Sequence, residues 1–262
     1  MEDKHFIFLA GLHRSGTSLL HEIIRDHPSV SGFLNTDAPE DEGQHLQNVY
    51  EPASTYGGPG KFIFDNRSYM NELHSLASNE SAIKIFDQWS QYYDTSREYL
   101  IEKSPPNLIR LRFLQKLYPA SKFIVILRHP LAVGYATQKW SKTSIKSLVV
   151  HSLMGYERFL KDLPFLNSVY VLRYEDFVVE PQSTLDSICK FLGLDSLCIT
   201  HKIRTDINEK YFEIWSKNRE SLINKLLFKV TPELECRANI FGYSLNKYNE
   251  LLPTSILGSH IK

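Results

Sequence analysis

A short segment near the start of the chain, GLHRSGTS at residues 11–18, has the spacing of a phosphate-binding loop. Gly11 and Gly16 enclose four residues, as in the glycine-rich loops that cradle nucleotide phosphates. Such a loop normally continues with a lysine, but here the next residue is Thr17, and the cation stands earlier, at Arg14. Backbone N–H groups at a helix N-terminus and an arginine fork both favour oxyanions. The segment therefore predicts an anion site, with a plain helix cap as the alternative interpretation.

Charged residues also follow three apolar runs further along the chain. Arg128 ends the run KFIVIL, where a charge is expected to face a crevice or to form a structural salt bridge. Lys103 lies in EKSPP, where a solvated lysine is the alternative to a site residue. Tyr174 follows Arg173 and offers a purine a flat face, with packing beside a surface charge pair as the alternative. Arg128 is predicted to form a second anion site, distant from the first loop, which suits a nucleotide with phosphates at both ends of its ribose.

These residues require a scaffold of alternating strands and helices. Apolar runs at residues 6–10, 99–101, 122–127 and 169–172 are typical of buried parallel strands. Helices are expected at residues 17–27, 108–117, 131–140, 144–160, 181–192, 217–228 and 231–241. This order predicts an α/β fold, a P-loop-like three-layer α/β/α arrangement around a central parallel sheet. The polar segments are expected to meet beyond the carboxyl ends of the strands.

The composition limits the classes of partner. The chain has 262 residues, is 42% hydrophobic, and has 30 basic and 30 acidic side chains, so it lacks the basic excess of a nonspecific nucleic-acid binder. No apolar run is long enough for a signal peptide or a membrane span, which predicts a cytoplasmic protein with no membrane partner. The three cysteines, Cys189, Cys198 and Cys236, have no metal-binding spacing, and no metal site is expected.

The motifs together resemble the PAPS-dependent sulfotransferase superfamily, where PAPS is adenosine 3′-phosphate 5′-phosphosulfate. GLHRSGTSLLHEIIRDHP is similar to the 5′-phosphosulfate loop of that family, and SKFIVILRHPLAVGYA to its 3′-phosphate strand and helix. EKSPPNL and VLRYEDF resemble segments of Golgi-type and tyrosylprotein sulfotransferases. PEDEGQHLQNVY and YGGPGKF are similar to a bacterial branch. The resemblance covers roughly residues 5–195 and implies a single sulfotransferase domain over residues 1–262.

The resemblance implies roles for individual residues. The 5′-phosphosulfate would be held by His13, Arg14, Ser15, Gly16, Thr17 and Ser18. Arg128 would hold the 3′-phosphate and Tyr174 would contact the adenine or the 3′ side. Ala136 stands where many members have a serine for the 3′-phosphate, and Thr137 is a candidate replacement. Residues 205–262 are expected to form a helical closing segment, with Lys210 and Trp215 as its donor contacts.

The acceptor is expected to bind in the loop region of residues 31–75. Candidates for a general base in its acidic part are Asp37, Glu40, Asp41, Glu42 and His45. Glu42 and His45 are favoured because they lie in the segment shared with the bacterial branch, although a merely solvated acidic loop is the alternative. The four acids within residues 37–42 also raise the hypothesis of a cationic acceptor.

The resemblance implies direct in-line transfer of a sulfuryl group from PAPS to a hydroxyl or amine of a small molecule. Adenosine 3′,5′-bisphosphate (PAP) would be the product. Arg14 and Lys103, with the loop N–H groups, would stabilise charge on the oxygen that bridges sulfur and the 5′-phosphate. The alternatives are a P-loop kinase or NTPase, which would need a lysine at Thr17 and a Mg²⁺ ligand, and a noncatalytic protein that binds PAP or PAPS.

Overall fold

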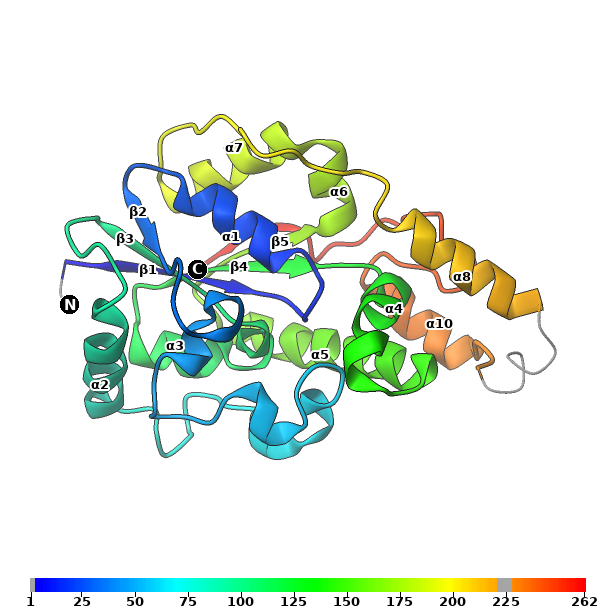
Figure 1. Ribbon diagram of the computed structural model, residues 1–262, viewed down its shortest axis with the longest axis horizontal. Helices are drawn as coiled ribbons and strands as arrows, with labels where there is room; N and C mark the ends of the chain where they lie inside the picture. The colour runs from blue at the N-terminus through cyan, green and yellow to red at the C-terminus, as the bar shows by residue number, and fades with distance from the viewer. Residues whose placement is uncertain (1–2, 221–227) are drawn as a thin grey trace.

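A six-stranded sheet forms the centre of the computed structural model, which describes residues 3–220 and 228–262 (Figure 1). The strand order is β2-β3-β1-β4-β5-β6. The strands are β1 (His5–Ala10), β2 (Val30–Gly32), β3 (Tyr99–Lys103), β4 (Lys122–Leu127), β5 (Ser168–Arg173) and β6 (Gly258–Ile261). The pairs β2–β3, β3–β1, β1–β4 and β4–β5 are parallel, and β6 is antiparallel to β5. The carboxyl ends of β1, β3, β4 and β5 therefore share one edge.

All four predicted strands are confirmed, and the two that the sequence did not indicate are short edge strands. β2 has three residues and β6 has four, which is too few for an apolar run or an alternation to stand out. The sequence indicated only helices after residue 205, and β6 adds an antiparallel edge strand near the end of that region.

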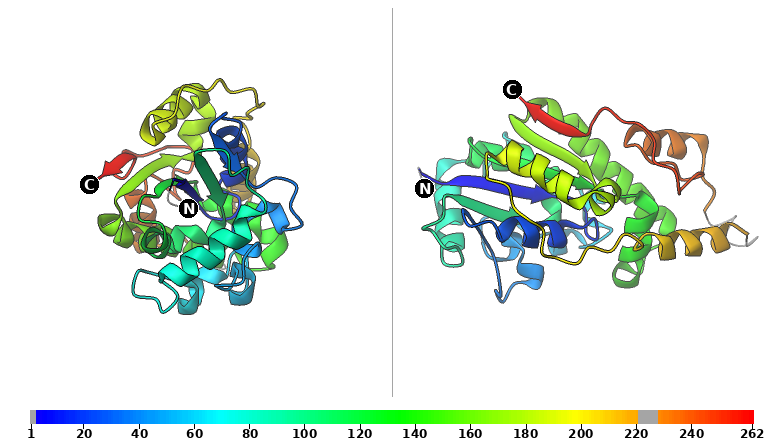
Figure 2. Two further views of the ribbon diagram at one scale, coloured as in Figure 1. Left: turned by 90° about the vertical axis from the view of Figure 1, so that its left-hand side faces the viewer. Right: turned by 90° about the horizontal axis from the view of Figure 1, so that it is seen from above.

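Helices cover both faces of the sheet and confirm the three-layer α/β/α architecture (Figure 1). One face carries α1 (Thr17–Arg25), α6 (Tyr174–Val179) and α7 (Pro181–Leu192). The other carries α2 (Asn79–Ser90), α3 (Leu111–Leu117), α4 (Pro130–Ser141), α5 (Ile145–Asp162) and α10 (Pro232–Ile240). Side chains of β1 alternate between the two cores, with Ile7 and Leu9 on one face and Phe6 and Phe8 on the other, as a pleated strand requires. The right-hand view of Figure 2 has α1 and α7 in front of the strands.

Most helix predictions agree with the structure to within a few residues. The helix expected at residues 217–228 is instead α8 (Glu209–Glu220), which starts eight residues earlier, and residues 221–227 lie outside the described part of the chain. α2 and α6 were not predicted. The segment before α3 begins as a 3-10 helix, η6 (Pro105–Ile109), directly after β3.

The region of residues 31–75, predicted as an ordered loop, is a chain of short 3-10 helices after β2. They are η1 (Pro39–Asp41), η2 (Gly43–His45), η3 (Ala53–Tyr56), η4 (Phe62–Phe64) and η5 (Asn66–Ser68). Phe62 and Ile63 are fully buried, and Trp89 of α2 donates its indole N–H to the Gly43 carbonyl at 2.9 Å. These contacts hold η2 close to the carboxyl edge of the sheet.

Candidate active site

The predicted phosphate loop joins β1 to α1. Its backbone enters the left-handed region at Arg14 (φ 68°) and Gly16 (φ 101°), and no side chain caps the N-terminus of α1. A Cβ at Gly16 would lie 2.5 Å from Cδ2 of Tyr174, so only glycine permits this close approach. The N–H groups that begin α1 are thus left for an anion.

Arg128 lies directly beyond β4 and is not distant from the loop as predicted. Its Nη1 donates to the carbonyl oxygen of Arg14 at 2.6 Å, because β1 and β4 are neighbours in the sheet. Its guanidinium stacks on the ring of Tyr174, with Cζ 4.2 Å from the ring centroid. Tyr174 therefore touches both the phosphate loop and Arg128, and the two cationic positions form one continuous site.

Asn208 completes the surroundings of Arg128 and was missed by the sequence reasoning. Its Oδ1 accepts from Nε and Nη2 of Arg128 at 2.9 and 2.6 Å, and its Nδ2 donates to Glu175 at 2.8 Å. Glu175 also accepts the backbone N–H of His129 at 2.9 Å, and burial raises its pKa. The only signal in the sequence was the position of Asn208 in the proposed closing segment, 80 residues from Arg128.

Ala136 and Thr137 lie on α4, and both are buried. Thr137 does not face Arg128: it lines a small cavity together with His13, and its Oγ1 has no hydrogen-bond partner. The carboxamide of Asn208, rather than a hydroxyl of α4, is the polar group that contacts Arg128.

Lys210 and Trp215, the two predicted donor contacts of the closing segment, lie in different surroundings. Lys210 is exposed, with Nζ 4.8 Å from the ring centroid of Tyr211, whose ring in turn lies 5.9 Å from Cζ of Arg128. Trp215 is buried against Phe228 and donates its indole N–H to the carbonyl of Leu245 at 3.2 Å. These contacts give Trp215 a packing role and do not support the predicted donor contact.

Lys103 and Glu42 form a buried pair, and Glu42 lines the same cavity as the phosphate loop. Nζ of Lys103 donates to the Glu40 carbonyl at 2.8 Å and lies 3.5 Å from Oε1 of Glu42, so this lysine is not a solvated one. Burial raises the pKa of Glu42, against the opposing effect of Lys103. His45 has Nε2 3.9 Å from Oε2 of Glu42, and burial lowers the pKa of His45.

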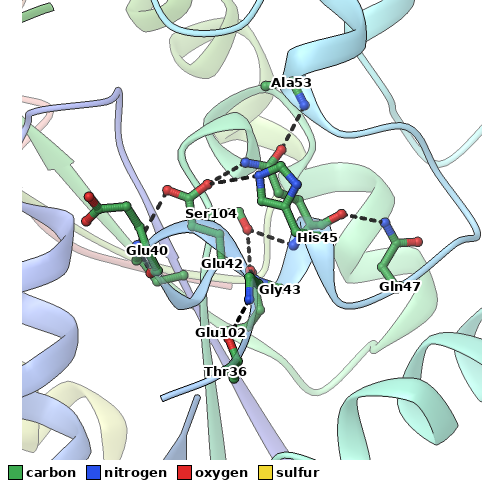
Figure 3. Close-up of polar contacts among 12 residues, drawn as sticks. Thr36, Glu40, Glu42, Gly43, His45, Gln47, Ala53, Glu102 and Ser104 are labelled. Atoms are coloured by element: carbon green, nitrogen blue, oxygen red, sulfur yellow. Dashed lines mark hydrogen bonds and ion pairs between the residues drawn. The ribbon is translucent and has the colours of Figure 1, made fainter. Parts of the chain in front are cut away.

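Glu102, which the sequence did not single out, fixes this arrangement from below (Figure 3). Its Oε1 accepts from the Gly43 backbone N–H at 3.0 Å and from the Ser104 hydroxyl at 2.5 Å. Its Oε2 accepts from Asn107 at 2.5 Å. The side chain is fully buried, and that burial raises its pKa to about 7. A charged residue inside a short strand was the available signal, because such a residue needs buried partners.

The remaining acidic candidates have other surroundings. Asp41 accepts from the backbone N–H groups of Asn35 and Thr36 at 3.2 and 2.7 Å, so it caps the loop. Glu40 is exposed but also lines the cavity beside the phosphate loop, whereas Asp37 is exposed and does not line it. Glu42 and His45 do line that cavity.

This cavity has a volume of about 340 Å³ and joins the two halves of the site. Its lining from the phosphate loop and the acceptor loop includes His13, Arg14, Thr17, Ser18, Glu40, Glu42, Gln44 and His45. Trp140 of α4 forms part of its wall. The indole ring makes a cation–π contact with the Arg14 guanidinium, whose Cζ lies 4.8 Å from the ring centroid. An anion held by the loop would therefore face Glu42 and His45.

Metal ligands and membrane-spanning helices concern residues 3–220 and 228–262, the part of the chain that the structure describes. No three His, Cys, Asp or Glu side chains there are grouped to hold a metal ion. No helix in that part of the chain has both the length and the apolar character needed to cross a bilayer.

Comparisons with known proteins agree with the site. A family model described as "Sulfotransferase family" matches residues 7–197. Omega-hydroxy-beta-dihydromenaquinone-9 sulfotransferase Stf3 of Mycobacterium bovis is 26% identical over 253 residues, which covers 76% of this chain and 65% of that protein. Protein-tyrosine sulfotransferase 2 of Gallus gallus is 24% identical over 215 residues, which covers 74% of this chain and 52% of that protein. The chain thus spans less than two-thirds of the length of these relatives.

Solved structures share the fold. Sulfotransferase STF9 from Mycobacterium avium has a TM-score of 0.58 at 11% identity, covering 96% of this chain and 79% of that one. The sulfotransferase domain from the Synechococcus PCC 7002 olefin synthase has a TM-score of 0.55 at 19% identity, covering 92% and 96%. Since the family match runs through the phosphate loop, Lys103 and Arg128, and covers most of the chain, this chain belongs to the sulfotransferase family.

Proposed function

We propose that this chain transfers the sulfuryl group of PAPS to a hydroxyl or amine of a small-molecule acceptor by direct in-line displacement. One observation carries the proposal. The phosphate loop lies between Arg128 on one side and, on the other, a cavity of about 340 Å³ lined by Glu42 and His45. A nucleotide with a 3′-phosphate at Arg128 and a 5′-phosphosulfate in the loop would present its sulfur to that cavity.

The reaction balances with the groups at hand. The acceptor oxygen or nitrogen forms a bond to sulfur while the bond from sulfur to the bridging oxygen breaks. The electron pair stays on the 5′-phosphate of PAP, and the acceptor proton passes to a base. Loop N–H groups and Arg14 face the oxygen on which charge develops, and Lys103 is a second cation near the cavity.

Glu42 is the better candidate for the base. A base works best when its pKa lies near the working pH, and burial raises the pKa of Glu42 toward that range. Burial lowers the pKa of His45, which makes this imidazole a weaker proton acceptor. In our proposal Glu42 takes the proton, while Lys103 and His45 border it.

The contacts favour an uncharged acceptor over a cationic one. The carboxylate of Asp41 is used by loop amides, and Glu42 is paired with Lys103. Asp37 and Glu40 are both exposed, but only Glu40 of these two lines the cavity, so little negative charge is left there for a cation. A neutral hydroxyl placed beside Glu42 fits the site better.

Calorimetry with PAP and AMP tests the donor half of the proposal, and transfer of ³⁵S from labelled PAPS to metabolite extracts tests the reaction. PAP is expected to bind much more tightly than AMP, and Arg128→Ala to remove that preference. Equal binding of PAP and AMP would contradict the donor site. Turnover of Mg²⁺-ATP without PAP binding would indicate a kinase or NTPase. Tight PAP binding with no labelled product from any acceptor would indicate a noncatalytic binder.

A further inference from the structure

The ring of His13, in the phosphate loop, lies between two cavities of very different size. The ring lines the cavity of the candidate active site and lies edge-on to Phe62, with centroids 5.7 Å apart. Its Nδ1 is buried and has no hydrogen-bond partner. Nε2 is therefore the nitrogen left to face the reaction cavity.

A second, much smaller cavity lies behind the ring. Its volume of about 10 Å³ is close to the minimum for one water. His13, Thr137 and His151 all line it, and the Thr137 hydroxyl is buried without a partner, as is Nδ1 of His13. Two buried polar groups without partners beside a space of this size satisfy the usual conditions for an internal water.

His151 sets the direction of the hydrogen bonds. Its Nε2 accepts from the backbone N–H of Ile63 at 3.4 Å, so in the neutral ring the proton must be on Nδ1. Burial lowers the pKa of His151 to about 3, which keeps the ring neutral. His151 can then donate its Nδ1–H to a water. Both protons of that water remain available for hydrogen bonds that the water donates.

We propose that a water held by His151 and Thr137 donates to Nδ1 of His13 and fixes the His13 proton on Nε2. In this tautomer Nε2–H points to the reaction cavity and donates a hydrogen bond to a sulfuryl oxygen of PAPS. His13 is then a catalytic residue, and Thr137 and His151 are positioning residues. The donor role rests on the proposed function, whereas the tautomer does not.

The electrostatics favour a donor over a base at this position. Burial, with Lys103 and His45 nearby, lowers the pKa of His13 to about 3. A ring with so low a pKa stays neutral at working pH and accepts a proton poorly. A neutral N–H can still stabilise charge that spreads onto sulfuryl oxygens during transfer.

Nitrogen-15 NMR of the full chain tests the tautomer without any ligand. The His13 signals are assigned by their loss in His13→Gln, whose amide can also place a donor near the Nε2 position. At pH 7 we expect His13 with its proton on Nε2, and a mixture of tautomers in Thr137→Val. Thr137→Ser, which keeps the hydroxyl, should match the wild type. A proton on Nδ1 of His13, or no change in Thr137→Val, would overturn the proposal.

Kinetics test the donor role. Thr137→Val should lower kcat about tenfold with unchanged PAP affinity and unchanged Tm, because only the orientation of one hydrogen bond is lost. His13→Leu should cost about 10²-fold and His13→Gln clearly less. Equal losses in His13→Leu and His13→Gln would refute the donor role. If PAP does not bind the wild type, the proposed function fails, and the NMR result still decides the tautomer.

Discussion

The two sides of the cavity are built by different means. The donor side consists of backbone N–H groups and two guanidinium groups, Arg14 and Arg128, and the proposed mechanism gives these groups no proton to take up or release. The acceptor side consists of buried acids around Lys103, of which Glu102 has its pKa raised to about 7 and Glu42 has its pKa raised in the same direction. The donor side is expected to be insensitive to pH, and the acceptor side to titrate.

The difference also concerns rigidity. Glu102 ties η2 to the end of β3 through Gly43, Ser104 and Asn107, so the acceptor side is fixed by buried hydrogen bonds. On the donor side, Nε and Nη2 of Arg128 are held by one side chain, that of Asn208, which lies directly before α8. A ligand can replace the latter contact more easily than the former.

The largest effect is expected from Glu42→Gln, which removes the proposed base with little change of shape. We expect kcat to fall by about 10²- to 10⁴-fold, the usual contribution of a general base. The wild-type rate should fall as the pH drops through the raised pKa of Glu42, since the base must be deprotonated, and this limb should vanish in the variant. Steady-state kinetics from pH 5 to pH 9 measure both.

His45→Asn is the matched control for that variant. It removes the other candidate base from the same cavity and should lower kcat much less. If His45→Asn is the more damaging change and Glu42→Gln keeps its acid limb, then His45 is the base and the assignment of Glu42 is wrong.

Glu102→Gln should alter the pH dependence of stability rather than the chemistry. The pKa of Glu102 rises from its ordinary 4.5 to about 7 on folding, so the folded protein binds the extra proton between these values. The contribution of Glu102 to the free energy of unfolding is therefore highest below about pH 4.5 and falls by about 3 kcal/mol as the pH rises to 7, whereas the buried neutral rings of His13 and His151 contribute with the opposite sign. The variant should lose this contribution, so the stability difference between the wild type and the variant should change by about the same amount over this pH range.

Urea unfolding at several pH values measures the stability difference. Asp65→Asn is a suitable control because Asp65 is away from Glu102. It is the N-cap residue of η5 and is partly exposed. A difference in stability between the wild type and Glu102→Gln that stays constant from pH 4.5 to 7 would show that Glu102 is not the titrating group.

The contrast between the two sides also explains what the sequence could predict. The phosphate loop could be recognised because its glycines, its cation and the start of α1 lie within eight consecutive residues. The four main strands were recognisable because each is buried on both faces and reads as an apolar run. Local patterns of this kind carry the donor loop and most of the fold.

The acceptor side and the Arg128 contacts depend on residues brought together only by folding. Glu42 and Lys103 are 61 residues apart, and Arg128 and Asn208 are 80 apart. Single residues in irregular segments have no periodicity, so Asn208 could not be found, and Trp215 was assigned to the ligand although it packs in the core. The distance between Arg14 and Arg128 was overestimated because the sequence does not reveal the order of the strands in the sheet.

Arg14→Ala tests the donor side directly. We expect turnover to fall on the order of 10²-fold or more, as for removal of one oxyanion donor. Because Arg14 is not the proposed base, the acid limb of the pH profile should remain in Arg14→Ala, unlike in Glu42→Gln. Arg14→Lys keeps the charge without the planar fork and should lose less. Near-normal turnover in Arg14→Ala would reject this residue as the charge stabiliser.

The smallest effect is expected from Asn208→Asp. A carboxylate at this position would accept the same Nε and Nη2 donors of Arg128 that Asn208 now occupies at 2.9 and 2.6 Å. The 3′-phosphate would have to displace a charged partner instead of a neutral one, so PAP should bind about tenfold more weakly. AMP, which lacks the 3′-phosphate, should bind equally to both proteins, and calorimetry with the two nucleotides separates these outcomes. Equal weakening of AMP and PAP would mean that Asn208 only shapes the loop, and unchanged PAP binding would mean that the phosphate does not compete for Arg128.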